Sequence, residues 1–203
     1  MPRLNRRVLK ITARHLKGVI QRRKKVRDEL LSVVDEKDSL IGTAPRTEVH
    51  SSEKWHRGVH VFIFDNEGRV LLQVRSSNKD KYPNTYDCSA SGHVGAGDTY
   101  EETIKREIKE ELGISRIKVQ PILKLRMSYG KNDNTVAVLF KATYSGKFKI
   151  DKEEVSSAKF VPISKVKEMI KTQKDKFSFW TLEFLKWYFD MPSAVHELPL
   201  CLS

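Results

Sequence analysis

One stretch limits the folds available to this chain more than any other part of the sequence. Residues 92–114 read GHVGAGDTYEETIKREIKEELGI, with three glycines within the first six positions. Glycines at this density let the backbone turn sharply and approach a ligand closely. Thr99 followed by Glu102 matches a capping box, so a helix should begin there, and Gly113 is placed to end it. The stretch therefore predicts a tight loop that leads directly into a helix.

This helix carries three carboxylates on one face. Glu107, Glu110 and Glu111 have the spacing i, i+3 and i+4, which brings their side chains within reach of a shared point. Like charges so close repel one another unless a cation lies among them. A hard divalent cation such as Mg²⁺ suits oxygen ligands and also binds substrate phosphate. The alternative is a solvated acidic face, and the glycine loop in front of the helix argues against it.

The same residues resemble the Nudix box. Its pattern is Gly, five residues, Glu, seven residues, Arg-Glu, an aliphatic residue, any residue, Glu-Glu, any residue, Gly and an aliphatic residue. The positions that match in register are Gly92, Arg106, Glu107, Ile108, Glu110, Glu111, Gly113 and Ile114. Asp98 stands where the family has Glu, and its side chain is one methylene shorter. We therefore expect the link between this acid and Arg106 to be longer than in the family, or mediated by water.

The resemblance implies a fold. The Nudix fold is an α+β fold in which a mixed β-sheet is sandwiched between α-helices, and it should cover about residues 28–190. Residues 191–203 would then form a C-terminal tail. Dimers are common among such proteins, so the resemblance also allows a homodimer.

The resemblance implies a metal site as well. The cofactor would be Mg²⁺, with Mn²⁺ as a substitute, and it would neutralise diphosphate charge and activate water. A further acid from a downstream loop often completes such sites, and Glu154, or Glu153 beside it, is the candidate here, with a plain surface acid as the alternative. The residues expected to bind the metal are Glu107, Glu110, Glu111 and Glu154.

Catalytic roles follow from the same match. Glu107 is the first candidate to orient or deprotonate the attacking water, and Glu110 is the second. Arg106 would hold the acidic face in position through a charge-assisted hydrogen bond. Gly92, at the start of the box, is expected to lie against the substrate.

Segments outside the box resemble the isopentenyl-diphosphate isomerase branch of the family. Arg75, Lys79 and Pro83 have the spacing of that branch, in which the matching Arg and Lys grip the diphosphate of the substrate. A planar guanidinium and a compact ammonium both suit such an anion. The alternative is two exposed cations at the end of a strand.

Other positions contradict an isomerase. The branch needs a catalytic Cys where this chain has Ser91, and Cys88 is out of register. A Glu pair of the isomerases is replaced by Asn-Asp-Asn at residues 132–134. His56 and His93 then lose the argument for metal binding, so we interpret both as structural hydrogen-bonding groups. The sequence predicts a hydrolase built on an isomerase-like scaffold.

Three functions remain open at this stage. The first is a Mg²⁺-dependent hydrolase that cleaves a diphosphate linkage in a nucleoside diphosphate derivative or a related small molecule. The second is isopentenyl-diphosphate delta-isomerase. The third is a module that binds RNA or a nucleotide through a basic N-terminal extension.

That extension is residues 1–27. It holds 11 of the 38 Lys and Arg and no acidic residue, which leaves 27 basic against 26 acidic residues elsewhere. Its apolar residues recur at helical spacing, so a basic amphipathic helix is expected, with a solvated or frayed extension as the alternative. Contact with nucleic acid or an anionic surface and mitochondrial targeting are also open. Cys88 and Cys201 form neither a disulfide framework nor a metal-ligand pattern, which favours an intracellular, by default cytoplasmic, protein.

The rest of the chain alternates strand and helix signals. The residues expected to form strands are 30–35, 39–43, 59–64, 70–75, 117–127 and 135–144. The expected helices after the box are 164–172, capped by Ser164, and 178–189. This order predicts an α+β domain, and no apolar run is long enough to span a bilayer.

Overall fold

The computed structural model describes residues 28–201. Its strands are β1 (Leu30–Val34), β2 (Leu40–Pro45), β3 (Trp55–Phe64), β4 (Val70–Arg75), β5 (Tyr86–Asp87), β6 (Ala90–His93), β7 (Val119–Ser128), β8 (Asn134–Thr143), β9 (Val155–Val161) and β10 (His196–Leu198). Its helices are α2 (Arg46–Val49), α3 (Tyr100–Leu112), the 3₁₀ turn η1 (Lys174–Lys176), α4 (Ile163–Thr172) and α5 (Phe179–Tyr188). The predictions for residues 1–27 lie outside the described residues.

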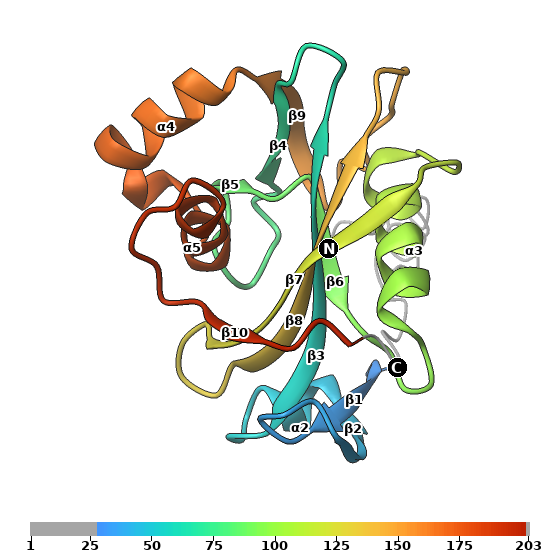
Figure 1. Cartoon of the computed structure of the whole chain (residues 1–203). Coiled ribbons are helices and arrows are strands. Elements are labelled where there is room, and N and C mark those ends of the chain that lie inside the picture. The colour runs from blue at the N-terminus through green and yellow to red at the C-terminus, as the bar shows by residue number, and fades with distance from the viewer. Residues whose placement is uncertain (1–27, 202–203) are drawn as a thin grey trace, which may run out of the picture.

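A single mixed sheet organises these elements. Its main path runs β10-β7-β8-β3-β1-β2, with β4 and β6 also paired to β3. β3 runs parallel to β8 and antiparallel to β1, β4 and β6. Helix α3 lies on one side of the sheet, and α4 and α5 lie on the other (Figure 1). The predicted α+β architecture, with a mixed sheet between helices, is confirmed.

The central strand β3 separates two hydrophobic cores. Successive side chains of a strand point to opposite faces of its sheet. Val59, Val61 and Ile63 pack into the core beneath α3, whereas Phe62 and Phe64 pack into the core beneath α4 and α5. Both faces of the sheet are therefore buried, and its central strand is fixed on both sides.

Most of the predicted elements are present, with revised ends. The prediction that Ser164 caps the fourth helix is wrong, because α4 already begins at Ile163 behind Pro162 and has no side-chain cap. Ser178 does cap α5, where its side chain accepts from the backbone N–H of Thr181. β9 was not expected, since its VSSAKFV sequence is half polar, yet it pairs with β4 along its length.

The C-terminal residues 191–201 contribute to the sheet. His196, Glu197 and Leu198 form β10, which pairs antiparallel with β7. Lys124 of β7 also donates to the carbonyl oxygen of Cys201 at 2.9 Å. Among the helices of residues 28–201, none is long and apolar enough to cross a membrane.

Candidate active site

The glycine loop before α3 is held by the first strand of the fold. The backbone N–H of Ala96 donates to the carbonyl of Leu30 at 2.8 Å, and that of Ser32 donates to the carbonyl of Val94 at 3.2 Å. The Ser32 hydroxyl adds a hydrogen bond to the carbonyl of Gly95 at 3.1 Å. β1 therefore fixes the loop that leads into the acidic helix.

Helix α3 has the ends that its sequence predicts. The Thr99 hydroxyl accepts from the backbone N–H of Glu102, and the Glu102 carboxylate accepts from the N–H of Thr99, so the capping box is complete. Gly113 ends the helix in the left-handed conformation, with a φ of 68°. Such caps fix where the helix starts and stops, and hence which residues face the sheet.

Gly92 of β6 allows the acidic helix to lie directly against the sheet. A Cβ atom at this position would lie 2.4 Å from Cδ of Glu107, far inside van der Waals contact. Any other residue would therefore displace the Glu107 carboxylate. The glycine predicted to approach the substrate serves first to make room for a carboxylate of the box.

Arg106 joins the loop to the helix. Its Nη1 donates to Oδ2 of Asp98 at 2.7 Å, and its Nη2 donates to Oε1 of Glu107 at 3.3 Å. The expectation of a long or water-mediated link to Asp98 is wrong. The loop brings the Asp98 backbone close enough to compensate for the missing methylene, since the backbone N–H of Asp98 folds back onto the carbonyl of Gly95 at 3.1 Å.

The three box carboxylates differ in exposure. Glu111 is buried, Glu107 is half-buried and Glu110 is exposed. Burial raises the pKa of Glu107 to about 7, with Glu110 adding to the rise and Arg106 opposing it. Burial, and next the charge of Glu107, raise the pKa of Glu111 to about 8. Carboxylates that are desolvated and repel one another are a suitable donor set for a hard divalent cation.

A buried amide, which the sequence analysis did not single out, contacts this set. Gln73 of β4 donates from Nε2 to Oε2 of Glu111 at 2.9 Å, and only 2% of Gln73 is exposed. A polar residue in the otherwise apolar run Val70–Val74 is the signal that could have identified it.

Lys79 and Glu154 lie beside the same carboxylates and pair with each other. The Lys79 ammonium donates to Oε2 of Glu154. Burial lowers the pKa of Lys79, and the negative charge of Glu111 is the largest influence that opposes this. Lys79 is thus paired with Glu154, on the turn before β9, and lies within the electrostatic influence of Glu111 of α3.

Arg75 is engaged within the protein. Its Nη1 donates to Oδ2 of the fully buried Asp87 at 2.7 Å, and its guanidinium lies 5.2 Å from the centre of the Trp180 ring. Asp87 also accepts from the Trp180 indole at 2.7 Å and from the Thr181 hydroxyl at 2.5 Å. Arg75 is therefore part of the contact that anchors α5 to the sheet.

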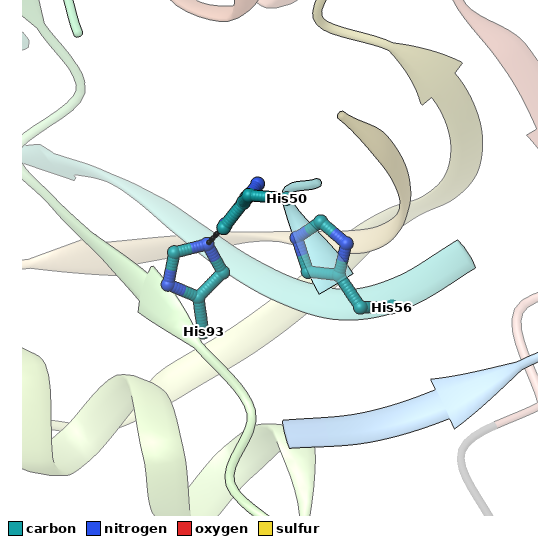
Figure 2. Close-up of side chains that lie close together, drawn as sticks. All are labelled: His50, His56 and His93. Atoms are coloured by element: carbon teal, nitrogen blue, oxygen red, sulfur yellow. Dashed lines mark hydrogen bonds between the residues drawn. The ribbon is translucent and has the colours of Figure 1, made fainter. Parts of the chain in front are cut away.

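A second cluster of metal-ligand type is made of histidines (Figure 2). His50 follows α2, His56 lies near the start of β3 and His93 ends β6. Each offers a ring nitrogen, and these nitrogens lie within 4.8 Å of one another. Nε2 of His50 and Nε2 of His93 are 3.2 Å apart. Sequence analysis interpreted His56 and His93 as separate structural groups and did not consider His50.

The histidines are in the form that binds metals. Burial lowers the pKa of His56 to about 4 and also lowers the pKa of His50 and His93, so the imidazoles are neutral near pH 7. A carboxylate oxygen of Asp133 lies 3.5 Å from Nδ1 of His50, and Lys81 donates to the other at 2.6 Å. Nitrogen ligands in this number suit a transition-metal ion such as Zn²⁺ better than Mg²⁺.

Ser91 occupies the position that resembles that of the isomerase thiol, and the thiol of Cys88 is not in a reactive form. Ser91 pairs with His60 across β6 and β3. Cys88 is fully buried, its sulfur lies 3.2 Å from the Thr181 hydroxyl, and burial raises the pKa of its thiol. A thiol that stays protonated in a closed core is a poor nucleophile or base.

Comparison with known proteins finds a family model and several relatives that match this chain. The family model described as NUDIX domain matches residues 54–188. A prenyl-diphosphate phosphatase of Methanosarcina mazei is 31% identical over 153 residues, covering 73% of this chain and 88% of that protein. Isopentenyl-diphosphate Delta-isomerase 2 of Photorhabdus laumondii is 28% identical over 157 residues, covering 75% of this chain and 88% of that protein.

The matches also include longer proteins and solved structures. Nudix hydrolase 3 of Arabidopsis thaliana is 35% identical over 140 residues, which are 62% of this chain and only 18% of that protein. A crystal structure of a Deinococcus radiodurans protein superposes with a TM-score of 0.62 at 24% identity, covering 71% of this chain and 90% of that one. The fold expected from the box is confirmed by these matches.

Proposed function

Because the chain belongs to the Nudix family, we propose that it is a Mg²⁺-dependent hydrolase that cleaves a diphosphate linkage in a small molecule. The observation that carries the proposal is the set of three carboxylates on α3, of which Glu107 lies against Gly92 and accepts from Arg106. Two of them are desolvated enough to have raised pKa values. Such a set is costly to keep in a fold unless it binds a cation.

The proposed ligands are Glu107, Glu110 and Glu111, with Glu154 as a fourth acid once Lys79 releases it. When bound, the cation would neutralise diphosphate charge and make phosphorus easier to attack. Arg106 keeps Glu107 in place through its two carboxylate contacts. Mn²⁺ takes similar oxygen ligands and should substitute for Mg²⁺.

In the proposed reaction, the oxygen of a water molecule forms a bond to one phosphorus of the substrate. The bridging P–O bond breaks, and the leaving phosphate takes the bonding electrons. Glu107 is the proposed acceptor of the proton of this water, because its half-buried carboxylate is held in place by Arg106 beside Gly92.

Lys79 and Arg75 are the proposed contacts of the diphosphate. Lys79 can exchange the Glu154 carboxylate for a phosphate oxygen, because only one ion pair has to be broken. Arg75 is fixed by Asp87 and can present its remaining N–H groups without reorganising. Gly92, which lies against Glu107, is the third proposed contact of the substrate.

The experiment is a hydrolysis screen with Mg²⁺ over nucleotide sugars, dinucleoside polyphosphates, coenzyme A, dinucleotide cofactors, capped RNA and prenyl diphosphates. Prenyl diphosphates are included because a relative is named for them. Glu107→Gln and Glu110→Gln should remove most activity while their circular dichroism spectra stay unchanged. If both variants hydrolyse the best substrate at the rate of the intact protein, the assignment of the site is wrong.

An isomerase remains the second candidate, because a relative is named as an isomerase. His93 of the cluster also lies two residues after Ser91, whose position resembles that of the isomerase thiol. Incubation with isopentenyl diphosphate separates the two functions. We expect release of phosphate or diphosphate, or no reaction, and no allylic isomer, since a serine hydroxyl is a poor proton donor and acceptor near neutral pH. Turnover to the allylic isomer contradicts the hydrolase proposal.

Binding of RNA through residues 1–27 is the third candidate, supported only by their charge. Phosphate neutralisation predicts an affinity for RNA that falls steeply with salt and disappears when residues 1–27 are deleted. Absent or salt-insensitive binding removes this candidate without affecting the hydrolase.

A further inference from the structure

Gln73 lies where a buried amide is hard to explain by packing alone. It follows Leu71 by two positions on β4, and Leu71 packs into the core beneath α3. Side chains two residues apart on a strand share a face. Gln73 therefore points toward α3 from within an apolar layer, and it meets α3 at the Glu111 carboxylate.

The direction of the amide is fixed by chemistry. With a cation bound, Glu111 is ionised and only accepts hydrogen bonds, so Gln73 turns its Nε2 toward Glu111. Its Oε1 then faces away from that carboxylate oxygen. Within residues 28–201, no donor reaches Oε1, although the atom is buried. Buried acceptors are nearly always hydrogen-bonded, so this one is an exception that calls for a partner.

The chemistry of the neighbours limits that partner. Glu111 stands next to Gln73 and is an acceptor. The two cationic side chains that follow Gln73 on this segment are already paired, Lys79 with Glu154 and Arg75 with Asp87. The missing partner must be a donor small enough to enter beside Glu111. Water is such a donor, and hydrolysis consumes one water molecule for each bond broken.

We propose that Gln73 is a positioning residue of the hydrolytic site: its Nε2 holds the Glu111 carboxylate, and its free Oε1 accepts a hydrogen bond from the water that attacks the substrate. This inference rests on the proposed function. It assigns to one amide both the placement of a ligand and the orientation of the nucleophile. Groups that orient metal ligands commonly affect metal affinity or activity by about 10- to 100-fold when they are removed.

The test uses the full chain with Gln73→Met, which keeps the length of the side chain and removes both polar atoms. Gln120→Met on β7 is the matched control, because it makes the same change at an exposed strand position. The first measurement needs no substrate: the rise in Tm on adding Mg²⁺ to protein prepared in EDTA. Gln73→Met should lose at least half of the rise, and Gln120→Met should keep it.

The second measurement is turnover of the best substrate, made well below the Tm of each variant. Gln73→Met should lower kcat by about 10- to 100-fold with KM changed by less than about 3-fold, because the lost contacts are to Glu111 and to water. Gln73→Glu keeps an acceptor oxygen at this position. It should therefore give a kcat between those of Gln73→Met and the intact protein.

The outcomes separate the two proposals. If the intact protein shows no Mg²⁺-induced rise in Tm, the metal site and hence the proposed function fail. If it shows the rise and Gln73→Met shows the same rise and the same kcat, Gln73 has no positioning role and the hydrolase proposal stands. If Gln73→Glu is no faster than Gln73→Met, the contact to water is refuted.

Discussion

The carboxylate cluster of α3 and the histidine cluster around His93 are adjacent in the fold but differ in origin and chemistry. Gly92 faces Glu107, and His93, the next residue of β6, belongs to the other cluster. One cluster comes from a single helix and offers oxygen ligands. The other comes from three separate elements and offers nitrogen ligands. Two neighbouring residues of a strand therefore serve two sites that should select different metal ions.

The clusters also respond to protons in opposite ways. Burial raises the pKa of Glu107 and Glu111, because it disfavours a negative charge. Burial lowers the pKa of His56, because it disfavours a positive charge. Desolvation thus favours the neutral form of Glu107, Glu111 and His56. Metal binding therefore requires the buried carboxyls to lose protons, whereas the histidines are already in the form that binds.

The largest effect should distinguish the clusters in catalysis. Glu107→Gln is expected to lower Mg²⁺-dependent hydrolysis by about 100-fold or more, because it removes both a ligand and the proposed base. His93→Ala should change the rate by less than about 5-fold, since its ring belongs to the other cluster. Initial rates with the best substrate measure both. A loss as large in His93→Ala as in Glu107→Gln would show that the two clusters form one site.

A smaller effect is expected from the residue that separates the clusters. In Gly92→Ala, the new methyl group would overlap the Glu107 carboxylate and force it aside. Overpacking of this kind costs about 1–3 kcal/mol of unfolding free energy, and the rate should fall by about 10-fold. Urea unfolding and initial rates measure the two effects. Ser91→Ala is the neighbouring control, and an unchanged rate in Gly92→Ala contradicts the close packing of α3 on β6.

Metal selectivity sharpens the comparison further. Zn²⁺ at about 100 times its dissociation constant should raise Tm by about 5–10 °C through the histidine cluster. His50→Ala should remove most of this rise, and His196→Ala, which changes an exposed histidine of β10, should keep it. Thermal melts with Zn²⁺ and with Mg²⁺ measure the preference. A Zn²⁺ rise that survives in His50→Ala assigns the ion to another site.

The smallest expected effect is the pH dependence of stability in EDTA. Glu107 and Glu111 have pKa values of about 7 and 8 in the fold, against 4.5 for an unperturbed Glu. Between about pH 4.5 and pH 8 the native state therefore binds more protons than the unfolded state, so the free energy of unfolding falls as pH rises through this range. His56 has a pKa of about 4 against 6.5, so its part of the stability is lost as pH falls from 6.5 to 4.

Melts between pH 4 and pH 9 in EDTA measure both trends. Glu111→Gln should flatten the alkaline decline, and His56→Asn should flatten the acidic one, because each removes one titrating group. Saturating Mg²⁺ should also reverse the alkaline decline, since the ion binds the ionised carboxylates. A melting temperature that rises steadily from pH 5 to pH 8 in EDTA would falsify the burial of the carboxylates.

The acidic helix was largely predictable because its information is local. The capping box at Thr99, the left-handed end at Gly113 and the spacing of the three carboxylates all follow from helical geometry within one segment. The same holds for β4, whose ends agree with the sequence prediction at Val70 and Arg75. Patterns of this kind depend on neighbours along the chain, which the sequence contains.

The histidine cluster was not predictable on the same basis. His50, His56 and His93 meet only because α2 leads into β3, and β6 pairs with β3 so that His93 lies opposite Gly58. Nothing in the spacing of 50, 56 and 93 along the chain indicates this. The half-polar β9 and the partner of Gln73 depend in the same way on which strands pair.

The sequence by itself determined the class of fold, the helix that presents Glu107, Glu110 and Glu111, and the chemistry that such a helix supports, because these depend on interactions between residues a few positions apart. Only the tertiary structure decided that Asp98 reaches Arg106 directly, that Lys79 pairs with Glu154, that Gln73 holds Glu111 and that three histidines converge. The Asp98–Arg106 contact spans only eight residues, but it depends on how the glycine loop folds back. The other contacts join segments far apart in the chain, and only the packing of α3 and the pairing of strands around β3 bring those segments within hydrogen-bonding distance.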